Sequence, residues 1–394
     1  MYLLQNSCVA ASAASALCLL WSSVRSGPLF WAGFALTMAA GSASTLGALG
    51  STLSVEREWT KALCGSDSEA LAQLNAAMKR IDLTCLIASP ILVGLVMQHA
   101  GGRPMVAATL VLLGWNLVSW PPEVLLLKYA QRRSPALAAD RPVNRPAAHS
   151  SGTAGPAAAD DDSKAKQPGG GSRGSGLQRQ FAAWALYARQ PAAAAALALA
   201  LLYFTVLSFG TLMTAYLKAL GLPEAELAVY RGLGALSGIL ATITFPLLHR
   251  GLGLVATGSL SIWLQLACLL AGVAPALAAA LGAAVGAKPR MYALVWGLVL
   301  SRFGLWSFDL AANQLIQESV EHSALGAVSG VQGSLQSLFQ MLAYAAGVLV
   351  PATDSFVWLM AGSCCIVGAA AALYTAFALH TRCGHSMHVM LQPV

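Results

Sequence analysis

The sequence has little charge for its length. Only 10% of its 394 residues are Asp, Glu, Lys or Arg, whereas an ordinary soluble domain has about 25%. Hydrophobic residues make up 57% of the chain, which is more apolar surface than a soluble fold can hide. This composition excludes an ordinary soluble enzyme and indicates an integral membrane protein.

The sequence also lacks the spacings that mark metal clusters and disulfide frameworks. Most of its eight cysteines lie within apolar runs, where a thiol acts as a small apolar side chain. No His-rich cluster and no paired acid and base stand at membrane depth, as a membrane-embedded enzyme would require. We therefore expect neither enzymatic activity nor a resident cofactor.

Long apolar runs, by contrast, are abundant. Nearly all of them reach the ~20 residues that cross a hydrocarbon core as a helix. They are apolar on every face, whereas a membrane strand alternates in polarity. The ten predicted spans are residues 3–20, 29–53, 82–97, 105–127, 192–217, 227–248, 252–272, 291–310, 326–350 and 355–380.

The formal charge of +7 comes from basic residues whose distribution between the apolar runs indicates the membrane topology. No basic stripe interleaved with aromatic residues occurs, so the sequence does not indicate nucleic-acid binding. If residues 130–190 are cytosolic, the basic loop containing Arg57, Lys61, Lys79 and Arg80 is cytosolic as well. Because Lys and Arg are concentrated in cytosolic loops, both termini are predicted to be cytosolic.

Residues 131–180 separate four predicted spans from six. This segment is rich in Ala, Pro, Gly, Ser, Asp and Lys and is predicted to be a disordered linker. The predicted organisation is an amino-terminal lobe (1–130), the linker, a carboxy-terminal lobe (181–380) and a cytosolic tail (381–394). Two helical lobes joined by a long cytosolic tether are typical of the major facilitator class. We therefore predict an all-α, major-facilitator-like two-lobe bundle of about ten transmembrane helices, with two further helices expected before the first.

One polar helix face stands out in the fourth span. Asn116, Ser119, Pro122 and Glu123 are three or four residues apart and so share a face. The prolines free backbone carbonyl groups one turn earlier, and such oxygens suit a divalent cation. The alternative is that Asn116 and Ser119 only bind a neighbouring helix, as polar membrane residues commonly do.

Further polar residues interrupt later spans. Arg302 and Asp309 are seven residues apart on the eighth span, so they face one side about 10 Å apart along the axis. They indicate either a transport path or a structural ion-pair network. Gln332, Gln336 and Gln340 form a stripe on the ninth span that is predicted to line a cavity.

Several motifs resemble those of ferroportins. The motifs are Val55-Glu56-Arg57-Glu58-Trp59, Arg80-Ile81-Asp82, Gly114-Trp115-Asn116-Leu117-Val118-Ser119, Gly304-Leu305-Trp306-Ser307-Phe308-Asp309-Leu310 and Gly330-Val331-Gln332. The resemblance covers almost all of the chain outside the linker. It implies twelve helices in two lobes, the first two of them missing here, and export of ferrous iron, cobalt or nickel.

The resemblance also assigns roles to residues of the first lobe. It implies a metal site at Asn116 and Ser119, whose further acidic ligand would lie on the missing first helix. It also implies a regulatory calcium site at Gln5, Asn116 and Glu123. A cytosolic gate that closes the two lobes together is implied at Arg57, Lys79 and Asp82.

The second lobe departs from the animal pattern of this family. Thr211 and Ala343 stand where animal members have a metal-binding Cys and His, which leaves Met213 as a polarisable group nearby. Because the hormone hepcidin acts on that Cys, regulation by hepcidin is not expected. Leu325 replaces a gating arginine. These differences resemble a plant or algal branch, found in plasma, vacuolar or plastid membranes.

The resulting prediction is a multi-pass transporter of divalent metal ions that works by alternating access within membrane lipid. Its expected path and gate residues are Arg57, Lys79, Asp82, Arg302, Asp309, Gln332, Thr211 and Met213. The alternative is a truncated, non-transporting paralogue or gene-model fragment that modulates a full-length transporter.

Overall fold

The computed structural model describes the chain apart from residues 1, 22–25, 135–136, 138–175, 351–354 and 391–394. Most of the predicted linker thus lies outside the described residues. The described residues form helices joined by short turns, and no strand occurs among them.

The first lobe is built from four long helices. Their starts carry recognisable signals: prolines open two of them, where a missing N–H costs nothing. Asp67 caps another by accepting 3.0 Å hydrogen bonds from the N–H groups of Glu69 and Ala70. The helices are α1 (Tyr2–Trp21), α2 (Pro28–Thr52), α4 (Ser68–His99) and α5 (Pro104–Arg133).

The second helix continues further than the sequence predicts. After α2 the chain passes directly into the π-helix η1 (Leu53–Trp59) and the short helix α3 (Thr60–Cys64). The prediction ended this span at residue 53, yet the apolar helix runs unbroken from Pro28 to Cys64. π-Helical turns within α-helices are rare and are frequently found at functional sites.

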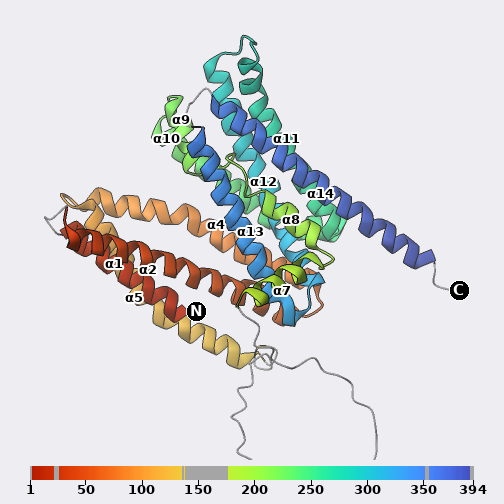
Figure 1. Ribbon diagram of the computed structural model, residues 1–394, viewed down its shortest axis with the longest axis horizontal. Coiled ribbons are helices and arrows are strands. Elements are labelled where there is room, and N and C mark those ends of the chain that lie inside the picture. Colours follow the sequence, from red (N-terminus) through yellow and green to blue (C-terminus); the bar gives the residue numbers. More distant parts are fainter. Residues whose placement is uncertain (1, 22–25, 135–136, 138–175, 351–354, 391–394) are drawn as a thin grey trace, which may run out of the picture.

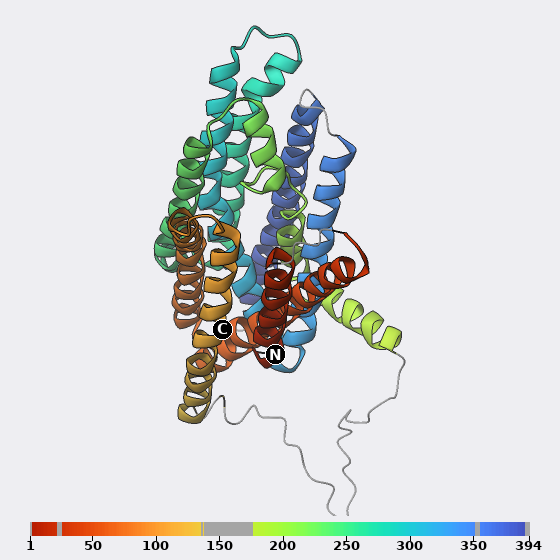
Figure 2. The same ribbon diagram turned by 90° about the vertical axis from the view of Figure 1, so that its left-hand side faces the viewer.

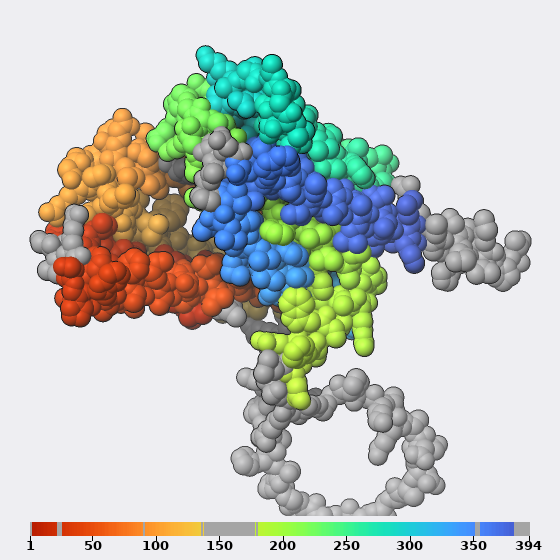
Figure 3. All heavy atoms as spheres, turned by 45° about the horizontal axis from the view of Figure 1, so that its top comes forward, coloured from red at the N-terminus to blue at the C-terminus, as the bar shows by residue number. Residues whose placement is uncertain are grey.

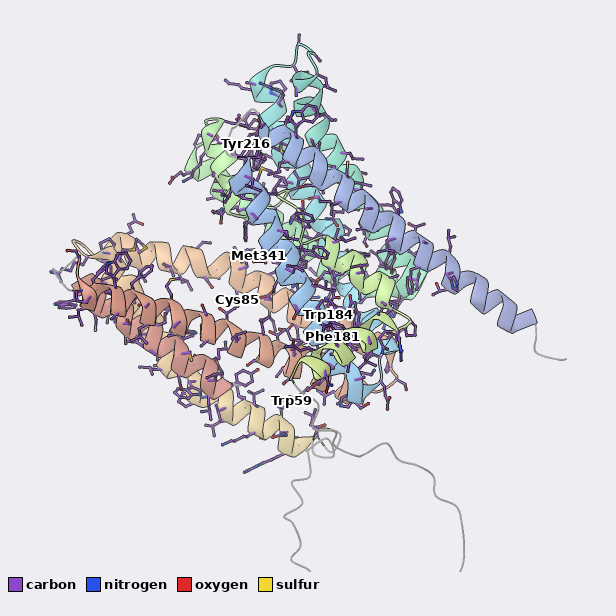
Figure 4. All side chains as sticks on the ribbon, in the orientation of Figure 1. Trp59, Cys85, Phe181, Trp184, Tyr216 and Met341 are labelled. Carbon is purple, nitrogen blue, oxygen red and sulfur yellow. The ribbon has the colours of Figure 1, made fainter. Side chains whose placement is uncertain are left out.

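The second lobe contains the larger core. Its helices are α7 (Gly176–Ala188), α8 (Ala193–Leu201), α9 (Thr211–Ala219), α10 (Glu224–Leu252), α11 (Leu254–Ala280), α12 (Ala287–Ser319), α13 (His322–Leu349) and α14 (Phe356–Met390). Leu199, Met213, Phe308 and Tyr374 are almost completely buried in one cluster. Phe181 and Trp184 of α7 lie at the lower end of this lobe beside α13 and remain partly exposed (Figure 4).

The prediction of one continuous helix over 192–217 is wrong. Helix α8 ends at Leu201, α9 begins at Thr211, and the residues between them are not helical. At membrane depth a break requires other partners for its backbone groups. The Val206 N–H donates to Ser363 Oγ (3.1 Å), and the Leu207 carbonyl accepts from Arg302 Nη2 (2.8 Å). Side chains from α12 and α14 therefore stabilise the break.

Among the described residues, eight helices are long and apolar enough to cross a membrane. They are α1, α2 continued to Cys64, α4, α5, α10, α11, α12 and α14. The other two predicted spans correspond to the interrupted pair α8–α9 and to α13, which carries the glutamine stripe.

The two lobes diverge from a common end. In Figure 1 the first lobe points to one side while the second stands upright, and in Figure 2 the second lobe extends beyond the first. The space-filling view shows a hollow between α4 and α13 (Figure 3). The lobes meet mainly where α4 packs against α10 and where η1 packs against α13.

Candidate functional site

The contact between the lobes forms a continuous seam along α4 and α10. Glu69 Oε2 lies 2.8 Å from Arg250 Nη2, and Arg80 Nε donates to Thr242 Oγ1 at 3.3 Å. Because rising numbers on α4 meet falling numbers on α10, the two helices run antiparallel. We call this contact the interlobe seam, formed by residues 69–83 of α4 with 238–250 of α10.

Buried amides extend the interlobe seam to α12. Asn75 Nδ2 donates to Gln317 Oε1 at 2.6 Å. Gln317 Nε2 in turn donates to the Glu56 carbonyl (2.9 Å) and to Thr60 Oγ1 (3.1 Å). The carboxamide of Gln317 thus joins α4, η1 and α3 to the second lobe.

Lys79 is the charged centre of the interlobe seam. Its Nζ lies 3.5 Å from Asp82 Oδ2 on its own helix and 3.8 Å from Asp309 Oδ2 on α12. It also lies 4.3 Å from the ring centroid of Trp306, a favourable cation–π geometry. The Asp309 side chain is only 10% exposed and that of Asp82 is 67% exposed. Lys79 therefore bridges one buried and one solvated carboxylate.

Beside Lys79 lies a polar cavity of about 190 Å³ between the lobes. Glu56 and Arg57 from η1 and Gln336 from α13 line it together with Lys79 and Asp309. Arg57 Nη1 is buried there without a hydrogen-bond partner. The structure thus brings together the predicted gate residues Arg57 and Lys79, and places Asp82 at the edge of the group.

A second polar cluster lies within the first lobe. Asn116 Nδ2 on α5 donates to Asn6 Oδ1 on α1 at 2.9 Å, and Asn6 Nδ2 donates to Glu123 Oε2 at 3.5 Å. Asn116 Oδ1 is buried without a partner. Asn6 therefore links Asn116 to Glu123, two turns further along α5. The cluster offers one carboxylate and one unengaged amide oxygen, which are ligand types that suit a hard cation.

The other residues predicted for this site make different contacts. Gln5 Oε1 accepts from Ser51 Oγ of α2 at 3.1 Å, and Ser119 Oγ donates to the Asn116 carbonyl of its own helix at 3.5 Å. Close packing holds Gln5 there, since a Cβ on Gly47 would come within 3.0 Å of it.

The break between α8 and α9 borders another cavity of about 190 Å³. The lining includes Thr211, Met213, Arg302 and Asp309, as well as the side chain of Gln265. Gln265 is 1% exposed, and its Oε1 has no hydrogen-bond partner. Asp309 lines both this cavity and the polar cavity at the interlobe seam, so one carboxylate connects them.

The glutamine stripe of α13 is divided among three environments. Gln336 lines the cavity at the interlobe seam and Gln340 lines the cavity at the break. Gln332 is buried, accepts from Tyr187 Oη at 2.7 Å and donates to the Ala196 carbonyl at 3.0 Å. Burial raises the pKa of Tyr187 to about 12, so its hydroxyl keeps its proton. Gln332 thus links α7 and α8 to α13.

Sequence reasoning missed several participants. Asn6 and Gln265 each interrupt an apolar run, and that signal, which singled out Asn116, was available for both. Tyr203, which lines the polar cavity at the interlobe seam, and Trp306 gave no such signal, since aromatic residues are common in membrane helices.

No group of three or more His, Cys, Asp or Glu side chains suited to a metal ion occurs in the described part of the chain. Among the described residues, the carboxylates that line the cavities at the interlobe seam and at the break are those of Glu56 and Asp309, and basic side chains lie beside them. Because affinity rises with the charge of the ligand set, such sites favour a cargo that binds and leaves over a permanently bound ion.

Comparison with known proteins agrees with this architecture. The family described as Ferroportin1 (FPN1) matches residues 1–367. The rice protein solute carrier family 40 member 1 is 36% identical over 92% of this chain and 72% of its own. A bacterial ferroportin homologue crystallised outward-facing with soaked iron is 25% identical, covering 96% of this chain and 81% of its own, with a TM-score of 0.74.

The inward-facing structure of a bacterial ferroportin homologue is less similar in shape. It is also 25% identical and covers 96% of this chain and 80% of its own, but its TM-score is 0.58. The predicted all-α membrane fold is confirmed by these likenesses and by the eight long apolar helices.

Proposed function

Because this chain belongs to the ferroportin family, a family of membrane transporters and not of enzymes, we propose that it exports ferrous iron or a related divalent ion by alternating access. It is a multi-pass membrane protein. Cobalt and nickel are the related ions that we include in the proposal.

The observation that carries the proposal is the one-sided contact between the lobes. The interlobe seam closes the end at Glu69–Arg250, and a hollow separates α4 from α13 (Figure 3). The end that the interlobe seam closes is the predicted cytosolic side. The arrangement therefore supports an outward-open state in a two-state transport cycle, in agreement with the higher similarity to the outward-facing relative.

The interlobe seam is weak enough to open during a cycle. The Glu69–Arg250 pair is about half exposed on both sides, and such pairs contribute about 0–1 kcal/mol. Hydrogen bonds such as Asn75–Gln317 contribute about 0.5–1.5 kcal/mol each. Opening this end would break a few such contacts and also separate the apolar contacts of α4 with α10 and α12, and contacts at the other end would offset both losses.

Lys79 offers a link between the cargo and the gate. Its Nζ lies at similar distances from Asp82 and Asp309. A divalent ion that reaches Asp309 would neutralise this carboxylate and release Lys79 to Asp82 on its own helix. During export, the Lys79–Asp309 contact between the lobes would therefore re-form as the ion leaves Asp309 and would hold the cytosolic end closed against its return.

In the first lobe, we propose that Asn116 and Glu123, with Asn6 beside them, form a binding site for the divalent ion. Amide and carboxylate oxygens are also the ligands that calcium prefers. A regulatory calcium ion at the same oxygens is part of the proposal.

The test is ion flux in proteoliposomes that contain this chain. Ferrous and cobalt ion flux should exceed that of empty liposomes, and Asn116→Ala should reduce it. Asn144→Ala, in the predicted linker, is the matched control and should leave flux unchanged. No flux from correctly folded protein would overturn the proposal and favour a non-transporting paralogue.

A further inference from the structure

A different cavity lies beyond the inner end of the interlobe seam. It has a volume of about 580 Å³, within the roughly 300–1,000 Å³ of pockets that bind small molecules. Helices α4 and α10 touch at Leu83 and Gly238 and then separate around it. Its walls come from both lobes: from α4 on one side, and from α10, α12 and the segment before α9 on the other.

The wall from the first lobe is aliphatic. Leu83, Leu86, Ile87 and Ile91 of α4 line it. The last three follow Leu83 by three, four and eight residues, so all four share one helix face. This face would cover an acyl chain without leaving a polar group unpaired.

The opposite wall carries two guanidinium groups, those of Arg231 on α10 and Arg302 on α12. The side-chain stem of Arg302 passes over Gly234, one turn from Arg231, so the two groups reach the same end of the cavity. No Asp or Glu is among the described residues that line it. The charge of this wall is therefore uncompensated by the cavity itself.

Both arginines keep donors free for a ligand. The hydrogen bonds described for them use Nη2. Arg302 donates to the Leu207 carbonyl and to Ser301 Oγ, and Arg231 donates to the Phe209 carbonyl and to Thr214 Oγ1 of α9. Arg302 Nε is buried without a partner, and an unpaired buried donor destabilises the folded protein. An acceptor supplied from outside would remove that destabilisation.

Backbone donors lie at the same end. Helix α9 begins at Thr211 directly after Gly210, which lines the cavity. The first-turn N–H groups of a helix lack intrahelical partners and favour negative charge. They add to the preference that the two arginines establish for an anion.

We propose that this cavity binds a single-chain amphiphile with a carboxylate head, a fatty acid, with its head at Arg231 and Arg302 and its chain along α4. A metal cation is disfavoured there by the two guanidinium groups. Because the ligand would touch both lobes, it would hold them apart at this point and favour the state in which the interlobe seam is closed. The proposal does not depend on which ion the protein transports.

Equilibrium binding of radiolabelled oleate to the purified full chain in non-ionic detergent tests this proposal. We expect saturable binding that Arg302→Gln and Arg231→Gln each weaken about tenfold, since a hydrogen bond to a charged group contributes about 1.5–3 kcal/mol. Arg290→Gln, on the same helix as Arg302 but outside the cavity, is the matched control and should bind like the parent protein. Oleyl alcohol, which lacks the charge, should bind more weakly than oleate and respond little to the arginine variants.

A second variant keeps the test informative if an arginine variant fails to fold. Ala235→Phe fills the cavity without changing charge and should abolish oleate binding while the protein stays monodisperse. Absence of saturable oleate binding, or equal binding by the parent, Arg302→Gln and Ala235→Phe proteins, would overturn the proposal. Arginine-dependent binding of dioleoyl phosphatidylglycerol without binding of oleate would also overturn it, because the ligand would then be a phospholipid.

Discussion

The missing side chain of Gly238 on α10 leaves the space that the indole of Trp306 occupies on α12. A Cβ at Gly238 would come within 3.0 Å of two indole atoms, closer than real Cβ contacts allow. The indole in turn lies beneath the ammonium group of Lys79. The packing of α10 on α12 thus sets the position of the charge at the interlobe seam.

Gly238→Ala should therefore loosen the interlobe seam. Overpacking costs about 1–3 kcal/mol, and the indole would have to move away from Lys79. Thr52 lines the adjacent cavity, so a Thr52→Cys reporter in a cysteine-free background can be labelled with a membrane-impermeant maleimide from the seam end. We expect labelling about fivefold faster or more. Gly251→Ala, with nothing within 4 Å of its Cβ, should leave the rate unchanged, and equal rates for both variants would contradict this account.

Exchange of the charges at positions 79 and 309 should separate gating from ion binding. Asp309→Asn removes both the partner of Lys79 and the carboxylate shared by the two cavities, so iron flux in proteoliposomes should fall about tenfold or more. The Lys79→Asp/Asp309→Lys double variant restores the ion pair with its charges reversed. Thr52→Cys labelling in this variant should therefore occur at the parent rate, while flux stays low. Recovery of flux would show that Asp309 acts only as a gate residue.

The control for this experiment is the ion pair of Lys218 on α9 and Glu224 at the start of α10, both outside the residues that form the interlobe seam. These side chains are 46% and 82% exposed, and such pairs contribute little. Lys218→Met with Glu224→Gln should change neither flux nor labelling.

Glu123→Gln should weaken divalent-ion binding in the first lobe about tenfold, because affinity follows the charge of the ligand set. Equilibrium binding of calcium and cobalt ions to the purified protein measures this effect. The same substitution at Glu226, a carboxylate near the start of α10, is the matched control. If both variants bind like the parent, the cluster of Asn6, Asn116 and Glu123 is only a helix-packing network.

Ser363→Ala should lower the thermal stability of the purified protein. It leaves the buried Val206 N–H without its acceptor, at a cost of about 1–3 kcal/mol. Ser334 is an exposed helical serine whose Oγ donates only to the Gly330 carbonyl of its own helix, so Ser334→Ala should have little effect. A Tm equal to that of the parent would mean that the break does not depend on Ser363.

Hydropathy predicted most membrane helices because an apolar run of sufficient length has no other stable form in a bilayer. It could not locate the break after Leu201, since Leu202, Val206 and Leu207 are as apolar as a helix interior. The information lies in the partners Ser363 and Arg302, which are about 100 or more residues away in sequence.

The sequence predicted those parts of the candidate sites whose polar residues lie close together within one span. Asn116 and Glu123 are polar residues at helical spacing, and the sequence was sufficient to group them. Asn6 joins them only because α1 packs on α5. The approach of Lys79 to Asp309 likewise depends on how two lobes meet, which helical periodicity within one span does not specify.

The π-helix η1 allows one continuous helix to serve two partners in different directions. Its wider turn holds one extra residue, so it offsets the helix faces before and after it by about 100°. Before the π-helix, Gly47 and Ser51 face α1. The Glu56 carbonyl within it and the Thr60 hydroxyl just after it accept from Gln317 of α12. Deletion of a single residue within 53–59 would leave the helix intact but rotate one of these faces away from its partner, so segment length matters here as much as residue identity.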